Sequence, residues 1–255
     1  MFFLNHTAAT PEENLALDEA LLDQAEELFA AREAGEPDRT PWLAEHDGEV
    51  LRLWEAPTPF VVLGSSSKFQ HEANVTACRD DGVPILRRAS GGAAIITGPG
   101  CLMYGVVLSY HARPELRDLD AAHRFMMQTL SRALSIEGLT ISVHGICDLV
   151  HEGRKFSGNS LRCKRTHLLY HGTLLYDYAL PNIARYLGTP ARMPEYRAGR
   201  AHESFVTNLP LPREKMVHAL RQAFAAQTEL PELPRARMQQ LVKEKYSLAS
   251  WTARF

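Results

Sequence analysis

The N-terminal part of the chain has an amphipathic pattern that predicts one long helix. Leu17, Leu21 and Leu28 recur at helical spacing, which places them on one face that can pack against a core. Residues 10–13, Thr-Pro-Glu-Glu, supply the start of the helix: a capping threonine, proline at the first helical position and an acid three residues after the cap. We therefore expect a helix from residue 10, followed by a polar surface loop over 34–47.

From residue 49 the pattern changes to short apolar runs separated by turns rich in proline and glycine, which is typical of β-strands. The predicted strands are 51–54, 60–63, 83–88, 93–96, 102–108, 139–143, 149–151, 155–162 and 168–176. The predicted later helices are 119–136, 181–187, 213–226 and 235–246. Strands clustered between helices predict an α+β (mixed α/β) domain with a mostly antiparallel or mixed central sheet flanked by helices.

Composition and charge exclude several classes of protein. Apolar residues make up 45% and charged residues 23% of the 255 residues, which is ordinary for a globular chain. A net charge of −2 gives no bulk attraction to nucleic acid or to an anionic membrane, so we expect neither partner. The four cysteines lack zinc-type spacing, and the N-terminus lacks the pattern of a signal peptide. These features favour free thiols and a cytoplasmic protein.

We see no internal repeat or strong linker, and therefore expect one domain over residues 1–255. Its core would cover about 10–210, and 211–255 would form a C-terminal helical extension.

Three segments combine polar side chains with glycine in patterns that can bind an anion. The first is 87–94, Arg-Arg-Ala-Ser-Gly-Gly-Ala-Ala. Glycine lets a ligand approach the backbone, successive N–H groups can surround an anionic oxygen, and arginine can grip phosphate or carboxylate with two parallel hydrogen bonds. Taken alone, the motif is better explained as a turn between two strands. The candidate binding residues here are Arg87, Arg88, Ser90, Gly91, Gly92 and Ala93.

The second segment, 145–160, contains an acid, a turn and a lysine. A hairpin turn at 152–153 would bring Asp148 near the strand that carries Lys155. A lysine in a cleft can neutralise charge that develops on oxygen, and a nearby carboxylate can orient it or bind Mg²⁺. A solvent-facing hairpin with a surface lysine explains the segment equally well. The small residues that would let a ligand approach are Ser157, Gly158 and Asn159.

The third segment is 171–175, His-Gly-Thr-Leu-Leu, inside an apolar run. His171, followed by Gly172, could orient a substrate. A hydrogen-bonded core histidine is the more common outcome in a buried strand, so both interpretations stay open.

Together the three segments resemble the lipoate–protein ligase A family, a branch of the biotin/lipoate ligase superfamily. The family pattern is approximately RRxSGGGAV, then G-x-x-DL leading to K-[FIV]-S-G-[NS]-[AS], then HGTLL. The corresponding letters here are RRASGGAAI, GICDLVHEGRKFSGNS and HGTLLY, in the family's order and close to its spacing. Agreement in flanking stretches extends the resemblance over about residues 14–209. It implies a mixed α/β catalytic domain with a central, largely antiparallel sheet.

The resemblance also implies a two-step reaction. Lipoate or octanoate would attack the α-phosphate of ATP to give an acyl-adenylate, and a carrier lysine would then attack the acyl carbon. Lys155 would be the catalytic residue, Arg88 and the turn 90–92 would border the acyl and phosphate site, and Asp148 would help place phosphate or Mg²⁺. The implied partners are lipoyl-carrier domains of 2-oxoacid dehydrogenase E2 subunits or of the glycine cleavage H protein.

The chain departs from the family pattern at several positions. Ala93 replaces the third glycine, and Thr97-Gly98 replaces a usual His-Asp pair, which leaves open whether this loop binds ATP. Ser67 stands where many members have glutamine, and Cys147 where asparagine or serine is common. The chain also ends near the expected end of the catalytic domain. We therefore expect the accessory C-terminal domain of many ligases to be absent or supplied by a separate chain.

These departures leave three functions open. The favoured one is an ATP-dependent ligase. The second is an ATP-independent octanoyltransferase with a thioester on Cys147, which lies eight residues before Lys155. The third is a non-catalytic acyl binder, including one of biotin-type specificity, which the altered loop favours and the retained Lys155 disfavours.

Overall fold

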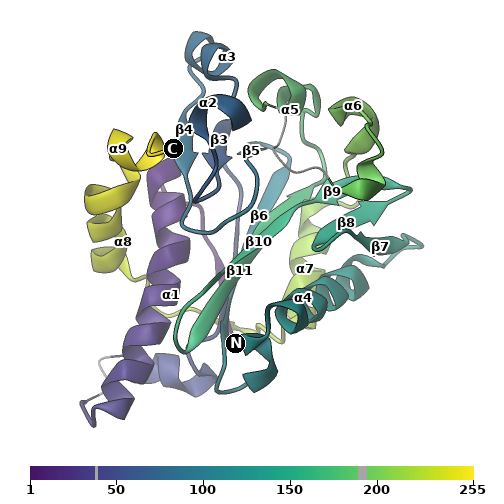
Figure 1. Ribbon diagram of the computed structural model, residues 1–255. Helices are drawn as coiled ribbons and strands as arrows, with labels where there is room; N and C mark the ends of the chain where they lie inside the picture. Colours follow the sequence, from purple (N-terminus) through teal and green to yellow (C-terminus); the bar gives the residue numbers. More distant parts are fainter. Residues whose placement is uncertain (38–39, 189–193) are drawn as a thin grey trace.

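A six-stranded sheet with mixed strand directions forms the centre of the molecule (Figure 1). The computed structural model describes residues 1–37, 40–188 and 194–255. Neighbouring strands from β10 to β2 pair antiparallel, whereas β2, β1 and β12 pair in parallel. The predicted α+β class with a mixed central sheet is confirmed. In spatial order the strands are β10 (Asn159–Cys163), β11 (His167–Leu175), β6 (Cys101–Ser109), β2 (Val50–Trp54), β1 (Phe2–Asn5) and β12 (Thr228–Glu229).

Helices cover both faces of this sheet. On one face lies α1 (Pro11–Glu33) with α8 (Arg235–Leu241) packed against it, and on the other lie α4 (Leu119–Leu134) and α7 (Arg213–Ala223) (Figure 1). Alternate strand residues therefore enter two different cores. Since both faces are covered, every residue of β6 and β11 is buried, and their sequences are apolar runs with little alternation.

Two three-stranded sheets carry the segments singled out in the sequence. The first has the order β4–β3–β5, and the glycine-rich segment connects β4 to β5. The second has the order β7–β8–β9, and β9 carries Lys155. The strands are β3 (Phe60–Leu63), β4 (Ile85–Arg87), β5 (Ile95–Thr97), β7 (Ile141–His144), β8 (Asp148–His151) and β9 (Arg154–Ser157).

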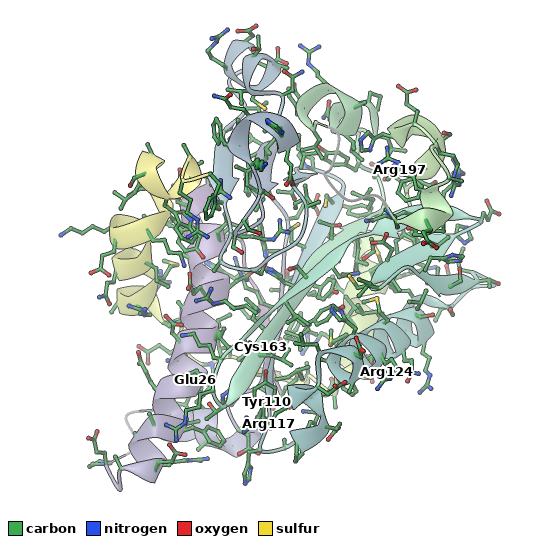
Figure 2. The ribbon with its side chains drawn as sticks, viewed as in Figure 1. Glu26, Tyr110, Arg117, Arg124, Cys163 and Arg197 are labelled. Carbon is green, nitrogen blue, oxygen red and sulfur yellow. The ribbon has the colours of Figure 1, made fainter. Side chains whose placement is uncertain are left out.

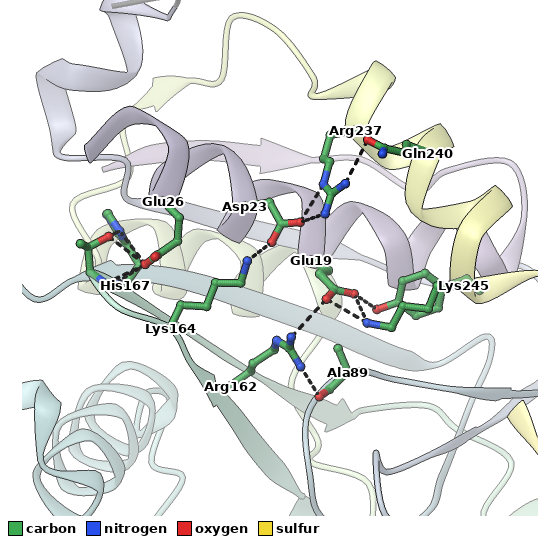
Figure 3. A network of polar contacts seen from close by, with 12 residues as sticks. Glu19, Asp23, Glu26, Ala89, Arg162, Lys164, His167, Arg237, Gln240 and Lys245 are labelled. Atoms are coloured by element: carbon green, nitrogen blue, oxygen red, sulfur yellow. Dashed lines mark hydrogen bonds and ion pairs between the residues drawn. The ribbon is translucent and has the colours of Figure 1, made fainter. Parts of the chain in front are cut away.

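The predicted helix start at Thr10 is confirmed: Thr10 and Glu13 form a reciprocal capping box. The helix continues to Glu33, and acidic side chains along it make polar contacts with other elements. Three acids on α1, Glu19, Asp23 and Glu26, bind the β10–β11 hairpin and the C-terminal helices (Figure 3). Each of these carboxylates has a cationic or N–H partner, which offsets the cost of removing it from water.

Several boundaries differ from the sequence prediction. The single strand expected over 155–162 is two strands, because the backbone changes partner at Gly158. The loop expected over 34–47 contains a 3-10 turn, and β1, which is not among the predicted strands, forms by parallel pairing with the distant strands β2 and β12. The remaining elements are η1 (Pro41–His46), α2 (Phe69–Glu72), α3 (Val75–Asp80), η2 (Pro114–Arg117), α5 (Pro181–Tyr186), η3 (Glu195–Arg197), α6 (His202–Phe205), the π-helical turn η4 (Val242–Tyr246) and α9 (Ala249–Thr252). Within the described ranges, no helix is long and apolar enough to cross a membrane.

Candidate active site

The glycine-rich segment forms an open loop over residues 88–94, which we call the glycine loop. Gly92 has φ +85°, a conformation that favours glycine, and it lies against Gly64, where a Cβ atom would be 1.9 Å from the Gly92 carbonyl oxygen. The N–H groups of Gly91, Gly92 and Ala93 donate to no acceptor among the described residues. Gly92 and Ala93 are also exposed, and a run of backbone N–H groups without protein acceptors is the kind of feature that can bind an anionic oxygen.

Arg88 is the first residue of the glycine loop, and its side chain binds carbonyl groups of the same loop. Its Nη2 donates to the carbonyl oxygens of Gly91 (2.6 Å) and Ala93 (3.0 Å), its Nε to Ser90 Oγ (3.0 Å) and its Nη1 to the Val62 carbonyl (3.2 Å). Burial lowers the pKa of Arg88 to about 10, so the guanidinium keeps its charge at neutral pH. The structure therefore gives Arg88 a position that supports the loop, and its role in binding a ligand stays a prediction.

Arg87 points to the opposite side of β4 and is fully buried. Its Nε donates to the carbonyl oxygens of Trp251 (3.1 Å) and Thr252 (2.9 Å), and its Nη1 to those of Gly64 (2.7 Å) and Ser67 (2.8 Å). Adjacent strand residues face opposite ways, which is why only one of the two arginines can reach the loop. The structure does not place Arg87 at the candidate site.

The hairpin expected at Glu152–Gly153 is present, and both turn residues have positive φ, as a two-residue hairpin turn requires. This turn brings Lys155 Nζ to 2.7 Å from Asp148 Oδ1. The other oxygen of Asp148 accepts a hydrogen bond from the Tyr196 hydroxyl at 2.7 Å. Burial, and then the charge of Asp148, raise the pKa of Tyr196 above its ordinary value, so the hydroxyl remains a donor. Lys155 is thus a cation held in place by a buried carboxylate.

A cavity of about 170 Å³ lies between the glycine loop and Lys155. Among the residues that the structure describes, its charged or titratable groups are Lys155, Glu72, Arg197 and His202, and Ala93 and Ser157 are also at its wall. An apolar cavity with a few convergent polar groups is the usual form of a small-molecule site. The apolar lining includes Ile95, Ile96, Leu175, Ile183, Leu187 and Phe205.

His171 connects the glycine loop to α1. Its Nε2 is 2.6 Å from Ser90 Oγ, and its Nδ1 is 3.5 Å from Asp18 Oδ2. Asp18 in turn pairs with the fully buried Arg52 at 2.5 Å. A serine, a histidine and an aspartate in this order can form a nucleophile relay, but Ser90 is only 2% exposed. The arrangement matches a hydrogen-bonded core histidine that also fixes Ser90.

Gly172 and Asn159 meet across β10 and β11. A Cβ atom on Gly172 would lie 1.9 Å from Asn159 Oδ1, so glycine is required there. The Asn159 amide nitrogen donates to the Cys147 carbonyl at 2.6 Å. Of the small residues predicted after Lys155, Ser157 and Gly158 line the cavity, whereas Asn159 does not.

Cys147 lies beside Asp148, and its thiol is 3.2 Å from the Asn159 carbonyl oxygen, to which it donates. Burial, and then the charge of Asp148, raise the pKa of this thiol, while the charge of Lys155 opposes the shift. The thiolate is the nucleophilic form of cysteine. The surroundings of Cys147 therefore favour a protonated, unreactive thiol.

Sequence reasoning missed four residues of the site: Glu72, Tyr196, Arg197 and His202. Three of them lie within 196–205, next to the family-like stretch 206–209, and Figure 2 places Arg197 in the part of the molecule that carries α5 and α6. Burial, and then the charges of Arg197 and Lys155, lower the pKa of His202. Arg197 and His202 are basic residues just before the family-like stretch 206–209, and this position in the sequence was the signal that could have indicated them.

The described residues contain no cluster of three or more His, Cys, Asp or Glu side chains that could enclose a metal ion. Asp148 is the carboxylate beside Lys155, and each of its oxygens already has one partner. Magnesium commonly binds through one or two carboxylates together with substrate phosphates, so a single carboxylate fits that mode.

Comparison with known proteins extends these observations. A sequence model of the lipoyl protein ligase A/B catalytic domain matches residues 10–228. Octanoyltransferase LipM of Carboxydothermus hydrogenoformans is 26% identical over 282 aligned residues, which cover 99% of this chain and 98% of LipM. Lipoate-protein ligases, some of them named as probable or putative, are 25% to 34% identical to this chain; they come from Mycoplasma pneumoniae, Schizosaccharomyces pombe, Aeropyrum pernix and Bacillus subtilis. The matches cover 52% to 78% of this chain, and the chain spans only 35% to 63% of those relatives' lengths.

Solved structures show the same fold. A bi-partite lipoate protein ligase from Thermoplasma acidophilum, described together with its E2 lipoyl domain, has a TM-score of 0.76 at 20% identity and covers 99% of this chain and 95% of its own. A lipoate-protein ligase A bound with ATP has a TM-score of 0.75 at 19% identity, with 99% and 98% coverage. At these identities the likeness establishes the fold alone. The match over residues 10–228 shows that the chain belongs to the lipoyl protein ligase A/B catalytic domain family.

Proposed function

We propose that this chain activates lipoate or octanoate with ATP and transfers the acyl group to a lysine of a carrier domain. The observation that carries the proposal is the position of Lys155. Its Nζ is held 2.7 Å from Asp148 Oδ1 at the wall of a largely apolar cavity, which the glycine loop also borders. A fixed ammonium at the wall of an apolar cavity, with unpaired backbone N–H groups in the adjoining loop, suits a reaction in which charge develops on the oxygens of an apolar acid.

In the first step a carboxylate oxygen of the acid forms a bond to the α-phosphorus of ATP, and the bond to pyrophosphate breaks. In the second step the amine of a carrier lysine attacks the acyl carbon, and AMP leaves with the electron pair of the broken C–O bond. Both steps increase negative charge on oxygen. Lys155 and the amides of Gly91 to Ala93 would therefore stabilise the transition states more than the ground states.

Asp148 is the residue that we propose to hold a magnesium ion brought by the nucleotide. The ion would share the carboxylate with Lys155, because both oxygens of Asp148 already have partners. When bound, Mg²⁺ would neutralise phosphate charge. The residues Lys155 and Tyr196 would keep the carboxylate in a single orientation.

We propose lipoyl-carrier domains of E2 subunits or H protein as acceptors. Support comes from the T. acidophilum ligase, described with its E2 lipoyl domain. That ligase is also described as bi-partite.

An ATP-independent octanoyltransferase is the second candidate, because octanoyltransferase LipM matches over almost the full length of both chains. Its thioester chemistry would need a reactive cysteine, and the raised pKa of Cys147 disfavours that residue. The ATP-dependent reaction needs no protein nucleophile. We therefore favour the ligase.

Mass spectrometry of the intact proteins separates the two. The chain is incubated with an apo carrier domain and either octanoate plus ATP or an octanoyl-carrier protein without ATP. We expect the apo carrier to gain the octanoyl mass only with octanoate and ATP. An octanoyl adduct on the chain itself without ATP, lost in Cys147→Ser, would establish the second candidate instead.

A further inference from the structure

Glu72, the last residue of α2, borders the cavity but belongs to none of the motifs that indicated the reaction. It is 9% exposed, and its Oε2 accepts two hydrogen bonds. One comes from the Ala94 backbone N–H and the other from the Ser67 hydroxyl, each at 2.8 Å. A buried carboxylate therefore holds the end of the glycine loop that leads into β5.

Ser67 fixes the carboxylate in this position. Its hydroxyl oxygen accepts the Gly64 N–H at 3.1 Å, and its single proton has two neighbouring acceptors, Glu72 Oε2 at 2.8 Å and the Gly92 carbonyl at 3.3 Å. The shorter and charge-assisted contact is the one with Glu72. Ser67 thus links the turn after β3 to the carboxylate and to the middle of the loop.

The loop is consequently held on both sides. Arg88 binds the carbonyl groups of Gly91 and Ala93, and Glu72 binds the N–H of Ala94. The three amides from Gly91 to Ala93 stay without an acceptor among the described residues. The charge of Glu72 does not stand alone, since it interacts with the buried guanidinium of Arg88.

We infer that Glu72, seated by Ser67, is a positioning residue that shapes the glycine loop so that its three free N–H groups face an anionic oxygen of the ligand. Two sources of that oxygen fit the same chemistry: the carboxylate of the acid and the α-phosphate of the nucleotide. The identity of these ligands rests on the proposed function. Although Glu72 borders the cavity, the role inferred for it is exerted through the loop, by way of its hydrogen bond with the Ala94 N–H.

The test compares Glu72→Ala, Glu72→Gln and Ser67→Ala in the full chain. The glutamine variant keeps an oxygen that can accept the Ala94 N–H, so it should restore much of what alanine loses. Glu26→Gln is the matched control: Glu26 accepts backbone N–H groups from Thr166 and His167 at 2.7 Å each but lies on α1 against the β10–β11 hairpin (Figure 3).

Two measurements are made on each variant. Calorimetric titration with octanoate and, separately, with ATP reports binding without turnover. Lipoate-dependent exchange of pyrophosphate into ATP reports kcat and KM for each substrate. The ligand whose affinity falls identifies the source of the oxygen that occupies the loop.

We expect Glu72→Ala to weaken binding of one ligand roughly 10-fold or more, with Ser67→Ala intermediate, Glu72→Gln near wild type and the control unchanged. Wild-type affinity of Glu72→Ala for both ligands would overturn the inference. So would a loss as large in Glu72→Gln as in Glu72→Ala, because it would show that the charge of Glu72 acts directly. If the wild-type chain binds octanoate or ATP but catalyses no exchange, the proposed function fails while the titrations still decide the role of Glu72.

Discussion

Lys155 is the residue on which the proposed reaction depends most directly, and Lys155→Met is the sharpest way to test it. Methionine keeps much of the volume of the side chain but removes the ammonium group. The substitution leaves Asp148 with the Tyr196 hydroxyl as its remaining side-chain partner at the site. The substitution changes no other residue of the cavity wall, so the variant tests the ammonium group together with its pairing to Asp148.

The expected loss of activity follows from the position of Nζ. Removing one positioned donor from a site where charge develops on oxygen typically lowers the rate about 10²- to 10³-fold, or about 2.7–4 kcal/mol. The effect on folding is a separate cost. The side chains of Lys155 and Asp148 are only 28% and 13% exposed, so removing the ammonium leaves a mostly buried carboxylate and should cost about 3 kcal/mol of stability. For a chain of this size that corresponds to a decrease in Tm of about 6–12 °C, so each variant is assayed well below its Tm.

The assay is lipoate-dependent pyrophosphate exchange together with acyl transfer to an apo carrier domain. Lys164→Met is a suitable control, because Lys164 also pairs with a buried carboxylate, Asp23, but lies on the hairpin next to α1. We expect the control to keep its activity. Transfer by Lys155→Met within a few-fold of wild type, in protein shown to be folded, would refute the proposed role of Lys155.

Three further outcomes follow from the geometry. Gly92→Val should abolish ligand binding, because Gly92 has φ +85° and a Cβ atom there would lie 2.9 Å from Arg88 Nη2. Gly91→Val has no atom within 4 Å of its Cβ position, so it should impair binding only by covering the free amides. Equal calorimetric affinities for wild type and both variants would show that the loop is merely structural. Cys147→Ser should retain most ATP-dependent transfer, measured as acyl mass on the carrier, because that reaction needs no protein nucleophile and burial raises the pKa of the Cys147 thiol. Burial lowers the pKa of His167 in the folded chain, so the free energy of unfolding should decrease as the pH falls through the unfolded-state pKa of about 6.5. Urea unfolding at pH 7.5 and pH 5.5 measures this decrease, which should be smaller in His167→Gln than in wild type.

Local sequence rules predicted the elements whose causes are local. The capping box at Thr10 and Glu13 and the hairpin turn at Glu152–Gly153 depend on neighbouring residues, and both are present in the structure. The turn then brings Asp148 and Lys155 into contact without any further assumption. By contrast, β1 is a four-residue strand stabilised by parallel pairing with β2 and β12, and partners that far along the chain leave no local pattern.

The roles of individual side chains were harder to predict, because they depend on direction and on distant partners. Arg87 and Arg88 are adjacent in a motif that suggests two ligand contacts, yet one holds the C-terminal segment and the other holds loop carbonyls. Glu72 has no motif of its own around it, and only the folded chain brings it to Ala94. Charge and glycine in a motif therefore indicated which segments border the cavity better than they indicated the direction of each side chain.

The departures from the family pattern are compatible with a working loop once the backbone is considered. Ala93 replaces a glycine, but the residue of the loop with positive φ is Gly92, so alanine at position 93 imposes no left-handed conformation. Ser67 replaces glutamine, and its shorter side chain still reaches both the Gly64 amide and the Glu72 carboxylate. Each substitution leaves the amides of Gly91 to Ala93 free, and these amides are the groups that an anionic ligand needs. The substitutions at positions 67 and 93 therefore make the sequence motif harder to recognise but leave the unpaired backbone N–H groups of the loop in place.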